Sequence, residues 1–186
     1  MLILGVSGSL RCGSHNSALL RAAARVLPAG IGLVRFGALA EIPPFDEDHD
    51  RKPAAAAVRR LRDAIASADA LLIATPEYNA SIPGQLKNAL DWASRPFATN
   101  VLRGKPVAVI GASTGPFGAV WAQAELRRVL RTIGARVVER ELAIAAAHAA
   151  FDPAGRLRGR GDRDSLSDVV RSLVEEAKQR PCGLAA

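Results

Sequence analysis

The chain has little cysteine, and its two cysteines stand near opposite ends, at Cys12 and Cys182. Two distant thiols make no disulfide framework, and neither a Cys-x-x-Cys pair nor a cysteine–histidine cluster offers a metal site. Long hydrophobic runs are missing too, since no apolar stretch approaches the roughly 18 residues that a membrane span needs. The first residues, MLILGVSGS, lack a basic leader before their short apolar run, unlike a signal peptide. These absences predict a cytoplasmic protein with no metal and no membrane partner.

Lysine is also scarce, because arginine outnumbers it 21 to 4 within a net charge of +7. In an alanine-rich chain this excess can reflect genomic composition, so the charge gives little support to nucleic-acid binding and we expect no nucleic-acid partner. At 186 residues, 49% of them hydrophobic and 23% charged, the chain can bury one sizeable core. We expect a single domain over residues 1–179 and a flexible tail at 180–186.

Short apolar runs alternate along the chain with segments of helical periodicity. The apolar runs predict strands at 2–7, 32–36, 69–75, 106–113 and 136–144. The periodic segments predict helices at 16–27, 53–67, 83–93, 119–132 and 165–178. Five strands, each followed by a helix, indicate an α/β fold with one parallel sheet covered on both faces. Ligands of such sheets bind beyond the carboxyl ends of the strands, where 7–17, 75–85 and 112–118 lie.

The first of these segments, SGSLRCGSHNS at 7–17, is dense in hydrogen-bond donors directly after a buried strand. Gly8 and Gly13 have the spacing of a nucleoside-triphosphate loop. However, Ser14 stands where that motif has its lysine, and His15 where it has a magnesium-binding hydroxyl. The dinucleotide fingerprint G-x-G-x-x-G is missing as well. The segment therefore predicts neither ATP hydrolysis nor dinucleotide binding.

A hydroxyl-rich loop that leads into a helix suits one terminal monophosphate, as in FMN. The free N–H groups and the positive dipole end of the helix favour a phosphate, and an arginine can neutralise its charge. The candidate phosphate-binding residues are Ser9, Arg11, Ser14, Asn16 and Ser17. The alternative interpretation is that Ser14 only caps the helix and its neighbours form a polar surface turn.

The second segment, TPEYNASIPGQLKNALDW at 75–92, leaves a predicted strand through a proline and enters a helix after Pro83 and Gly84. A backbone this constrained can present fixed N–H and C=O groups to the polar edge of a flat ring, with Tyr78 beside it. The alternative interpretation is a strand-to-helix loop of ordinary turn residues.

Three segments together carry a resemblance to a known family. They are GSLRCGSHNSALL (8–20), PEYNASIPGQLKNALDW (76–92) and GASTGPFGAVWAQAELRRVL (111–130). They resemble the signatures of the NADPH-dependent FMN reductase family, which includes flavin, quinone, azo-dye and chromate reductases. The resemblance extends from residue 2 to about 157, and the 76–92 motif is its specific part. One departure is Ala119, where the family has the second of two adjacent glycines.

The resemblance implies a flavodoxin-like fold, in which a doubly wound sheet has five parallel strands in the order 2-1-3-4-5. It also implies a homodimer or homotetramer and non-covalently bound FMN. The residues that would hold the FMN phosphate are Ser9, Arg11, Ser14, Asn16 and Ser17. Those that would line the isoalloxazine ring are Pro76, Glu77, Tyr78 and Asn79. Further flavin contacts would come from Ser113, Gly115 and Gly118.

The activity that the resemblance implies is transfer of a hydride from NADPH or NADH through FMN to a small-molecule acceptor. Free flavin, a quinone, an azo compound or chromate could serve as the acceptor. Because the flavin carries the chemistry, we assign no catalytic acid, base or nucleophile. Two alternatives are an electron carrier like flavodoxin and a flavin-binding regulatory protein. The carrier is disfavoured, because Tyr78 and Phe117 are the only aromatic residues of the three loops and cannot readily clamp both faces of the ring.

Two further expectations concern the surface. The helical segments after the second and third signatures carry many apolar residues, which predicts a subunit contact. These residues are Ile82, Leu86, Leu90, Trp92, Val120, Trp121, Leu126 and Leu130. The arginines at 156, 158, 160 and 163 predict a solvated loop, with steering of the anionic NADPH as the alternative.

Overall fold

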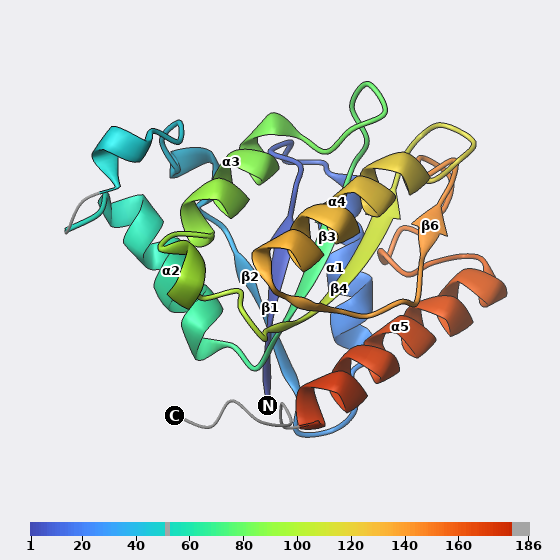
Figure 1. Ribbon diagram of the computed structural model, residues 1–186. Coiled ribbons are helices and arrows are strands. Elements are labelled where there is room, and N and C mark those ends of the chain that lie inside the picture. The colour runs from blue at the N-terminus through green and yellow to red at the C-terminus, as the bar shows by residue number, and fades with distance from the viewer. Residues whose placement is uncertain (51–52, 180–186) are drawn as a thin grey trace.

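The computed structural model describes residues 1–50 and 53–179, in which strands and helices alternate as predicted (Figure 1). In chain order the elements are β1 (Leu2–Ser7), α1 (His15–Arg25), β2 (Gly32–Phe36), α2 (Ala56–Ser67), β3 (Ala70–Thr75), α3 (Gly84–Ala93), β4 (Pro106–Ala112), α4 (Val120–Ile133), β5 (Arg136–Val137), β6 (Ala143–Ile144) and α5 (Arg160–Lys178). None of the helices within these residues is long and apolar enough to cross a bilayer. The predicted tail at 180–186, with Cys182, lies outside the described residues.

The strands form one parallel sheet in the order β2-β1-β3-β4-β5, with β6 also paired to β4. This confirms the strand order implied by the family resemblance. Every residue of β3 and β4 is buried, because both strands lie inside the sheet and helices cover both of its faces. Burial on both faces explains why their sequences are continuous apolar runs rather than alternating ones.

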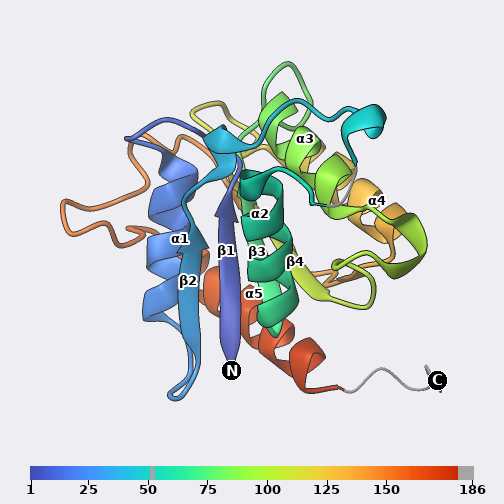
Figure 2. The ribbon, with the colours of Figure 1, turned by 90° about the vertical axis from the view of Figure 1, so that its left-hand side faces the viewer.

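The helices form a layer on each side of the sheet, as the view from the β2 edge shows for α1 and α2 (Figure 2). Side chains that point to one face of a strand pack with one layer and their neighbours pack with the other. Leu71 and Ile73 of β3 belong to the core beneath α2, α3 and α4. Leu72 and Ala74 belong to the core beneath α1 and α5.

The predicted fifth strand is the clearest departure from the sequence analysis. Instead of one strand over 136–144, two short strands pair with β4 at its two ends, Arg136–Val137 and Ala143–Ile144. The backbone carbonyl of Val109, between these pairings, accepts a hydrogen bond of 3.3 Å from Nη2 of the buried Arg127. Nη1 of Arg127 also pairs with Glu141 at 2.9 Å. A side chain thus occupies the position in which a continuous strand would pair.

The last helix begins at Arg160, whereas its apolar periodicity predicts a start at about residue 165. Its first turn is mostly exposed, and the first buried apolar residue is Leu166. Asp162 in the first turn suits the positive end of the helix dipole, but this turn has no apolar residue that could reveal the helix in the sequence.

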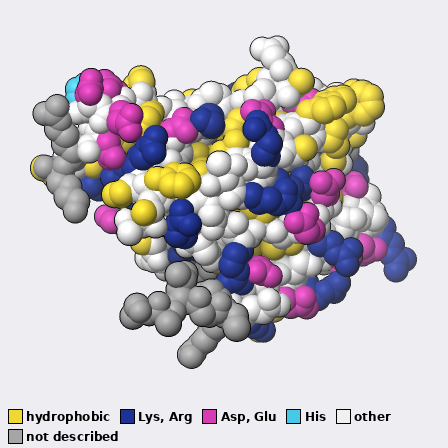
Figure 3. Space-filling view, in the orientation of Figure 1, with side chains coloured by type: hydrophobic (Ala, Val, Ile, Leu, Met, Phe, Trp, Pro, Cys, Tyr) yellow, Lys and Arg dark blue, Asp and Glu magenta, His cyan; other side chains and the backbone are white. Residues whose placement is uncertain are grey.

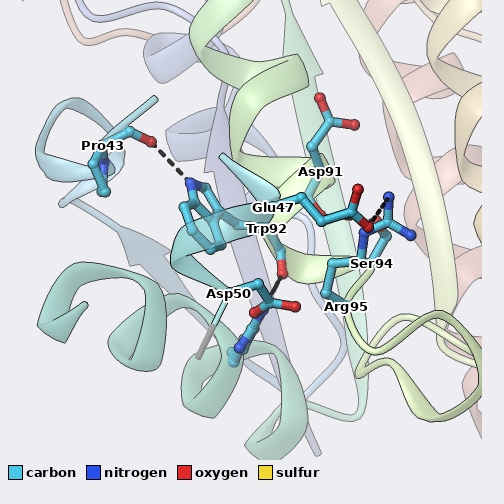
Figure 4. Close-up of polar contacts among 8 residues, drawn as sticks. Pro43, Glu47, Asp50, Asp91, Trp92, Ser94 and Arg95 are labelled. Atoms are coloured by element: carbon cyan, nitrogen blue, oxygen red, sulfur yellow. Dashed lines mark hydrogen bonds and ion pairs between the residues drawn. The ribbon is translucent and has the colours of Figure 1, made fainter. Parts of the chain in front are cut away.

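Most of the apolar residues that predicted a subunit contact are buried inside the chain itself. Leu86 and Trp92 are 1% exposed, and Leu126 and Leu130 are 0% exposed. Trp92 also donates from Nε1 to the backbone carbonyl of Pro43 at 2.9 Å, as Figure 4 shows. The predicted use of these side chains in a subunit contact is therefore wrong, and among the large residues of that set only Trp121 is well exposed, at 49%.

The arginine-rich loop before α5 is held by its own side chains. Arg156 pairs with Asp152 at 2.8 Å, and its backbone N–H and side chain together lower the pKa of that carboxyl. Arg163 donates from Nη1 to the carbonyls of Leu157 and Arg158, both at 2.7 Å. Arg158 donates from Nε to the carbonyl of Phe151 at 3.1 Å, so three of the four arginines brace the loop. These contacts favour a role within the loop itself over the steering of NADPH.

Candidate functional site

Three loops meet beyond the carboxyl ends of the adjacent strands β1, β3 and β4. They cover residues 8–14, 76–83 and 113–119, which overlap most of the three segments that the sequence singled out, 7–17, 75–85 and 112–118. One cavity opens between them. The residues that line it are Ser9, Arg11, Ser14, His15, Asn16, Pro76, Glu77, Tyr78, Ala112, Ser113 and Thr114.

Eight of the twelve predicted site residues line this cavity, and the other four lie beside it. Ser17 donates its hydroxyl to Oγ of Ser7 at 3.1 Å, behind the first loop. Gly118, with a φ of +60°, packs so closely on the chain after it that a Cβ there would lie 2.5 Å from the carbonyl carbon of Ala143. Only glycine fits that position, so its role is to shape the third loop. Asn79 shapes the turn of the second loop, and Gly115 shapes a turn of the third.

The first loop combines a helix cap with a group of unpaired donors. Oγ of Ser14 accepts from the N–H of Ser17 at 3.3 Å, so the predicted cap is present. The guanidinium of Arg11 pairs with no group in the described part of the chain. Backbone N–H groups without a hydrogen-bond partner among the described residues belong to Cys12, Gly13, His15 and Asn16. Such a cluster at the positive end of a helix suits an anion, so the cap is compatible with the predicted phosphate binding.

Asn16 connects the first and third loops. It is 2% exposed, and its amide donates to the carbonyl of Ala112 at 2.9 Å and accepts from the N–H of Ala112 at 3.0 Å. This two-way bond joins the start of α1 to the end of β4. The side chain therefore holds two walls of the cavity together, while its contact with a phosphate stays a prediction.

His15 lines the cavity although the sequence analysis did not select it. Its ring stacks on Phe151, with the centroids 6.3 Å apart and the planes 6° from parallel. Burial, followed by the nearby charges of Arg11 and His148, lowers its pKa. The one signal for this residue in the sequence was its place between two candidate phosphate-binding residues, Ser14 and Asn16.

The second loop is a tight hairpin tip. Tyr78 and Ser81 exchange backbone hydrogen bonds of 3.0 and 3.1 Å. Between them, Asn79 and Ala80 have φ values of 53° and 61°, the left-handed conformation that two-residue hairpin turns require. Ala80 occupies a position that favours glycine, so the tip carries backbone strain.

Two glutamates tie this loop to α4. Oε2 of Glu77 accepts from the N–H of Ala122 at 3.0 Å and so satisfies a free donor in the first turn of that helix. Oε2 of Glu125 accepts from Oγ of Ser81 at 2.7 Å and from the N–H of Ile82 at 3.3 Å. Glu77 therefore reaches the cavity wall as a positioned, already engaged carboxylate.

The third loop has a left-handed residue at Ala119, where the family resemblance implies a glycine. Ala119 has φ 66° and ψ 36°, the left-handed conformation that a glycine adopts without strain, and it is 1% exposed. Ser113 accepts at Oγ from the N–H of Gly115 at 3.1 Å, and its own N–H donates to Ile144 at 3.0 Å. The loop is thus preformed.

Few aromatic side chains line the cavity. Tyr78 is the one benzenoid ring among the lining residues, and it is 48% exposed. Phe117 turns away and makes an edge-to-face pair with Trp121, with centroids 5.0 Å apart. Within the described residues, no group of three His, Cys, Asp or Glu could hold a metal ion. The site is suited to an organic anion with a flat ring, one face of which can stay open.

Comparisons with known proteins agree with this geometry. An NAD(P)H-dependent FMN reductase of Pseudomonas aeruginosa is 43% identical over 178 residues, which cover 95% of this chain and 91% of the relative. A quinone reductase of Pseudomonas putida is 35% identical over 172 residues, which cover 92% and 89%. The solved structure of a flavoenzyme NAD(P)H:acceptor oxidoreductase from Paracoccus denitrificans superimposes with a TM-score of 0.86 at 34% identity, covering 95% of this chain and 97% of that one. Residues 1–149 match the family model, and the chain belongs to the NADPH-dependent FMN reductase family.

Proposed function

We propose that this protein is an FMN-dependent oxidoreductase that oxidises NADPH or NADH and reduces a small acceptor of the quinone type. The relatives named above include FMN and quinone reductases, and the family is one of FMN reductases. The observation that carries the proposal is the cluster of unpaired donors at the start of α1, placed beside two rigid loops in one cavity. A phosphate at the donors would leave the other two loops to hold the ring.

The residues of the chain bind and orient the cofactor. Arg11 and the free N–H groups of the first loop hold the phosphate, and the hairpin at 76–81 holds the ring edge. Bound FMN supplies the hydride transfer, so no side chain needs to act as an acid or base. Because Tyr78 is the one benzenoid ring among the lining residues, the open face can receive the donor and then the acceptor.

The test is rapid-mixing spectroscopy of the purified protein, loaded with FMN, under anaerobic conditions. NADPH or NADH should bleach the flavin absorbance, and a quinone should restore it. Because donor and acceptor would use the same open face one after the other, double-reciprocal plots of the initial rate at different acceptor concentrations should be parallel lines. Free flavin, an azo dye and chromate complete the acceptor panel, and a quinone should be reduced fastest. If the flavin is not bleached by either nucleotide, the chain is an electron carrier or a flavin-binding regulator instead.

We further propose that the protein forms a homodimer around the start of α4. Phe117 is 56% and Trp121 49% exposed, although they lie in direct contact with each other, and Tyr78 nearby is 48% exposed. Figure 3 shows hydrophobic side chains gathered over this end of the molecule. Large exposed rings of this kind are enriched at the centres of protein interfaces. The contact would lie directly beside the cavity.

Light scattering at micromolar concentration tests the dimer. The wild-type protein should have twice the mass of one chain, and a variant with Phe117→Ser and Trp121→Ser should be monomeric. The matched control is Phe97→Ser, because Phe97 is as exposed, at 48%, but lies after α3. A monomeric wild type, or equal effects of both variants, would overturn this part of the proposal.

A further inference from the structure

His15 is placed to contact whatever anion binds at the start of α1. It is the first residue of that helix and it lines the cavity next to the capping residue Ser14. The parallel ring of Phe151 supports its imidazole on one side. Neither ring nitrogen has a hydrogen-bond partner in the described part of the chain. The imidazole is therefore held in place while its two polar atoms stay available to a ligand.

The charged groups around the imidazole are mostly positive. Arg11 faces it from the first loop, His148 from the turn that precedes Phe151, and the dipole end of α1 adds to them. On the β3 side, Glu77 and Tyr78 line the same cavity, but the carboxylate of Glu77 already accepts from the N–H of Ala122. Burial, followed by the charge of Arg11, lowers the pKa of His15 from its usual 6.5, so in the free protein the neutral ring predominates at pH 7.

We propose that His15 is a further phosphate-binding residue and that binding of FMN is coupled to the uptake of one proton by its imidazole. The inference rests on the proposed function, which puts the FMN phosphate at the start of α1. A phosphate dianion brings the negative charge that this part of the cavity lacks, so it favours the protonated ring. The proton comes from the solvent, and the protonated ring then donates a charge-assisted hydrogen bond to a phosphate oxygen.

The sign of the pH dependence follows from this coupling. The pKa of His15 is low in the free protein and higher in the complex, so between the two values binding takes up a proton. FMN affinity should therefore fall as the pH rises through neutrality, by at most about tenfold per pH unit for one full proton. The phosphate has its own pKa near about 6, so a variant without the imidazole is needed to separate the two effects.

The experiment titrates the full-length apoprotein with FMN and with riboflavin between pH 6 and 8, by quenching of flavin fluorescence and by calorimetry. His15→Gln keeps a polar side chain but cannot take up the proton. It should weaken FMN binding about tenfold at the acidic end and hardly at all at the alkaline end. Calorimetry in two buffers of different ionisation enthalpy should show less proton uptake for the variant. Riboflavin, which has no phosphate, should bind both proteins equally, which also shows that the variant is folded.

His49→Gln is the matched control, because His49 pairs with Asp46 on an exposed turn and does not line the cavity. Its FMN titrations should match those of the wild type. Since the chain has only three histidines, the ring signals of His15 can be followed by NMR, and their pKa should rise when FMN is added. Coincident pH profiles of wild type and His15→Gln, an unchanged pKa, or equal loss of riboflavin binding would overturn the inference. If FMN does not bind at all, the proposed function fails instead.

Discussion

Replacing Glu125 by alanine should loosen the loop that presents Tyr78 to the cavity. Glu125 lies in α4, and its carboxylate accepts from both the hydroxyl of Ser81 and the N–H of Ile82, at 2.7 and 3.3 Å. These bonds hold the base of a hairpin whose tip contains two left-handed residues. Without them, the strained tip lacks the contact that keeps it closed.

The magnitude follows from the two bonds. A hydrogen bond to a charged group contributes about 1.5–3 kcal/mol, but one of these is long and the half-exposed carboxylate is partly screened by water. Loss of both should lower the free energy of unfolding by about 2 kcal/mol. This net figure already subtracts the few tenths of a kcal/mol that the better helix propensity of alanine restores. For a domain of this size that corresponds to a fall in Tm of roughly 4–8 °C.

The assay combines urea unfolding with hydrogen exchange and an FMN titration. The amides of Ser81 and Ile82 should exchange faster, and FMN should bind more weakly because the loop must be ordered on binding. Glu125→Gln keeps an acceptor oxygen and should lose about half as much stability. Arg128→Ala, an exposed change on the same helix, should have little effect. If Glu125→Ala unfolds at the wild-type urea concentration with unchanged exchange at residues 81 and 82, the two bonds do not hold the loop.

Three further predictions concern single residues. Arg11→Ala should raise the Kd for FMN about ten- to a hundredfold and leave riboflavin binding unchanged, and equal losses would assign Arg11 to the shape of the loop. Ala80→Gly should raise the free energy of unfolding by about 0.5–1 kcal/mol, because the exposed Ala80 has a φ of 61°. Ala124→Gly, at an exposed position within a helix, should instead lower the free energy of unfolding by about as much. A lower free energy of unfolding for Ala80→Gly would contradict the strain argument. Because the pKa of His15 lies below 6.5 in the folded protein, the unfolded chain binds a proton there first, so the apoprotein should lose stability as the pH falls below that value. In urea titrations the His15→Gln variant should lose less stability than the wild type as the pH falls. Parallel profiles of stability against pH for the two proteins would refute this prediction.

The sequence by itself determined the order of the elements and the edge at which the site lies. Apolar runs such as 69–75 can be predicted as strands from the sequence, because strands buried on both faces are apolar almost throughout. Parallel strands end at one edge, so donors placed after three of them had to meet there. The dense donors of the first loop pointed to an anion, because a hydroxyl, a guanidinium and a helix end favour the same ligand wherever the chain places them.

Only the tertiary structure decided what each polar or apolar residue contacts. Periodicity shows that a face is buried but not by what, so Leu126 and Leu130 could be assigned to a subunit contact although they fill the core of their own chain. Arg127 interrupts the fifth strand because its side chain bonds to a carbonyl of β4. The two residues are 18 positions apart, so no local sequence pattern could predict this contact. His15 likewise acquires its stacking partner, Phe151, and one of its two charged neighbours, His148, from a segment more than a hundred residues away. Local sequence sets which conformations and faces are available, whereas contacts between distant segments select the partners and, with them, the charge and rigidity of the site.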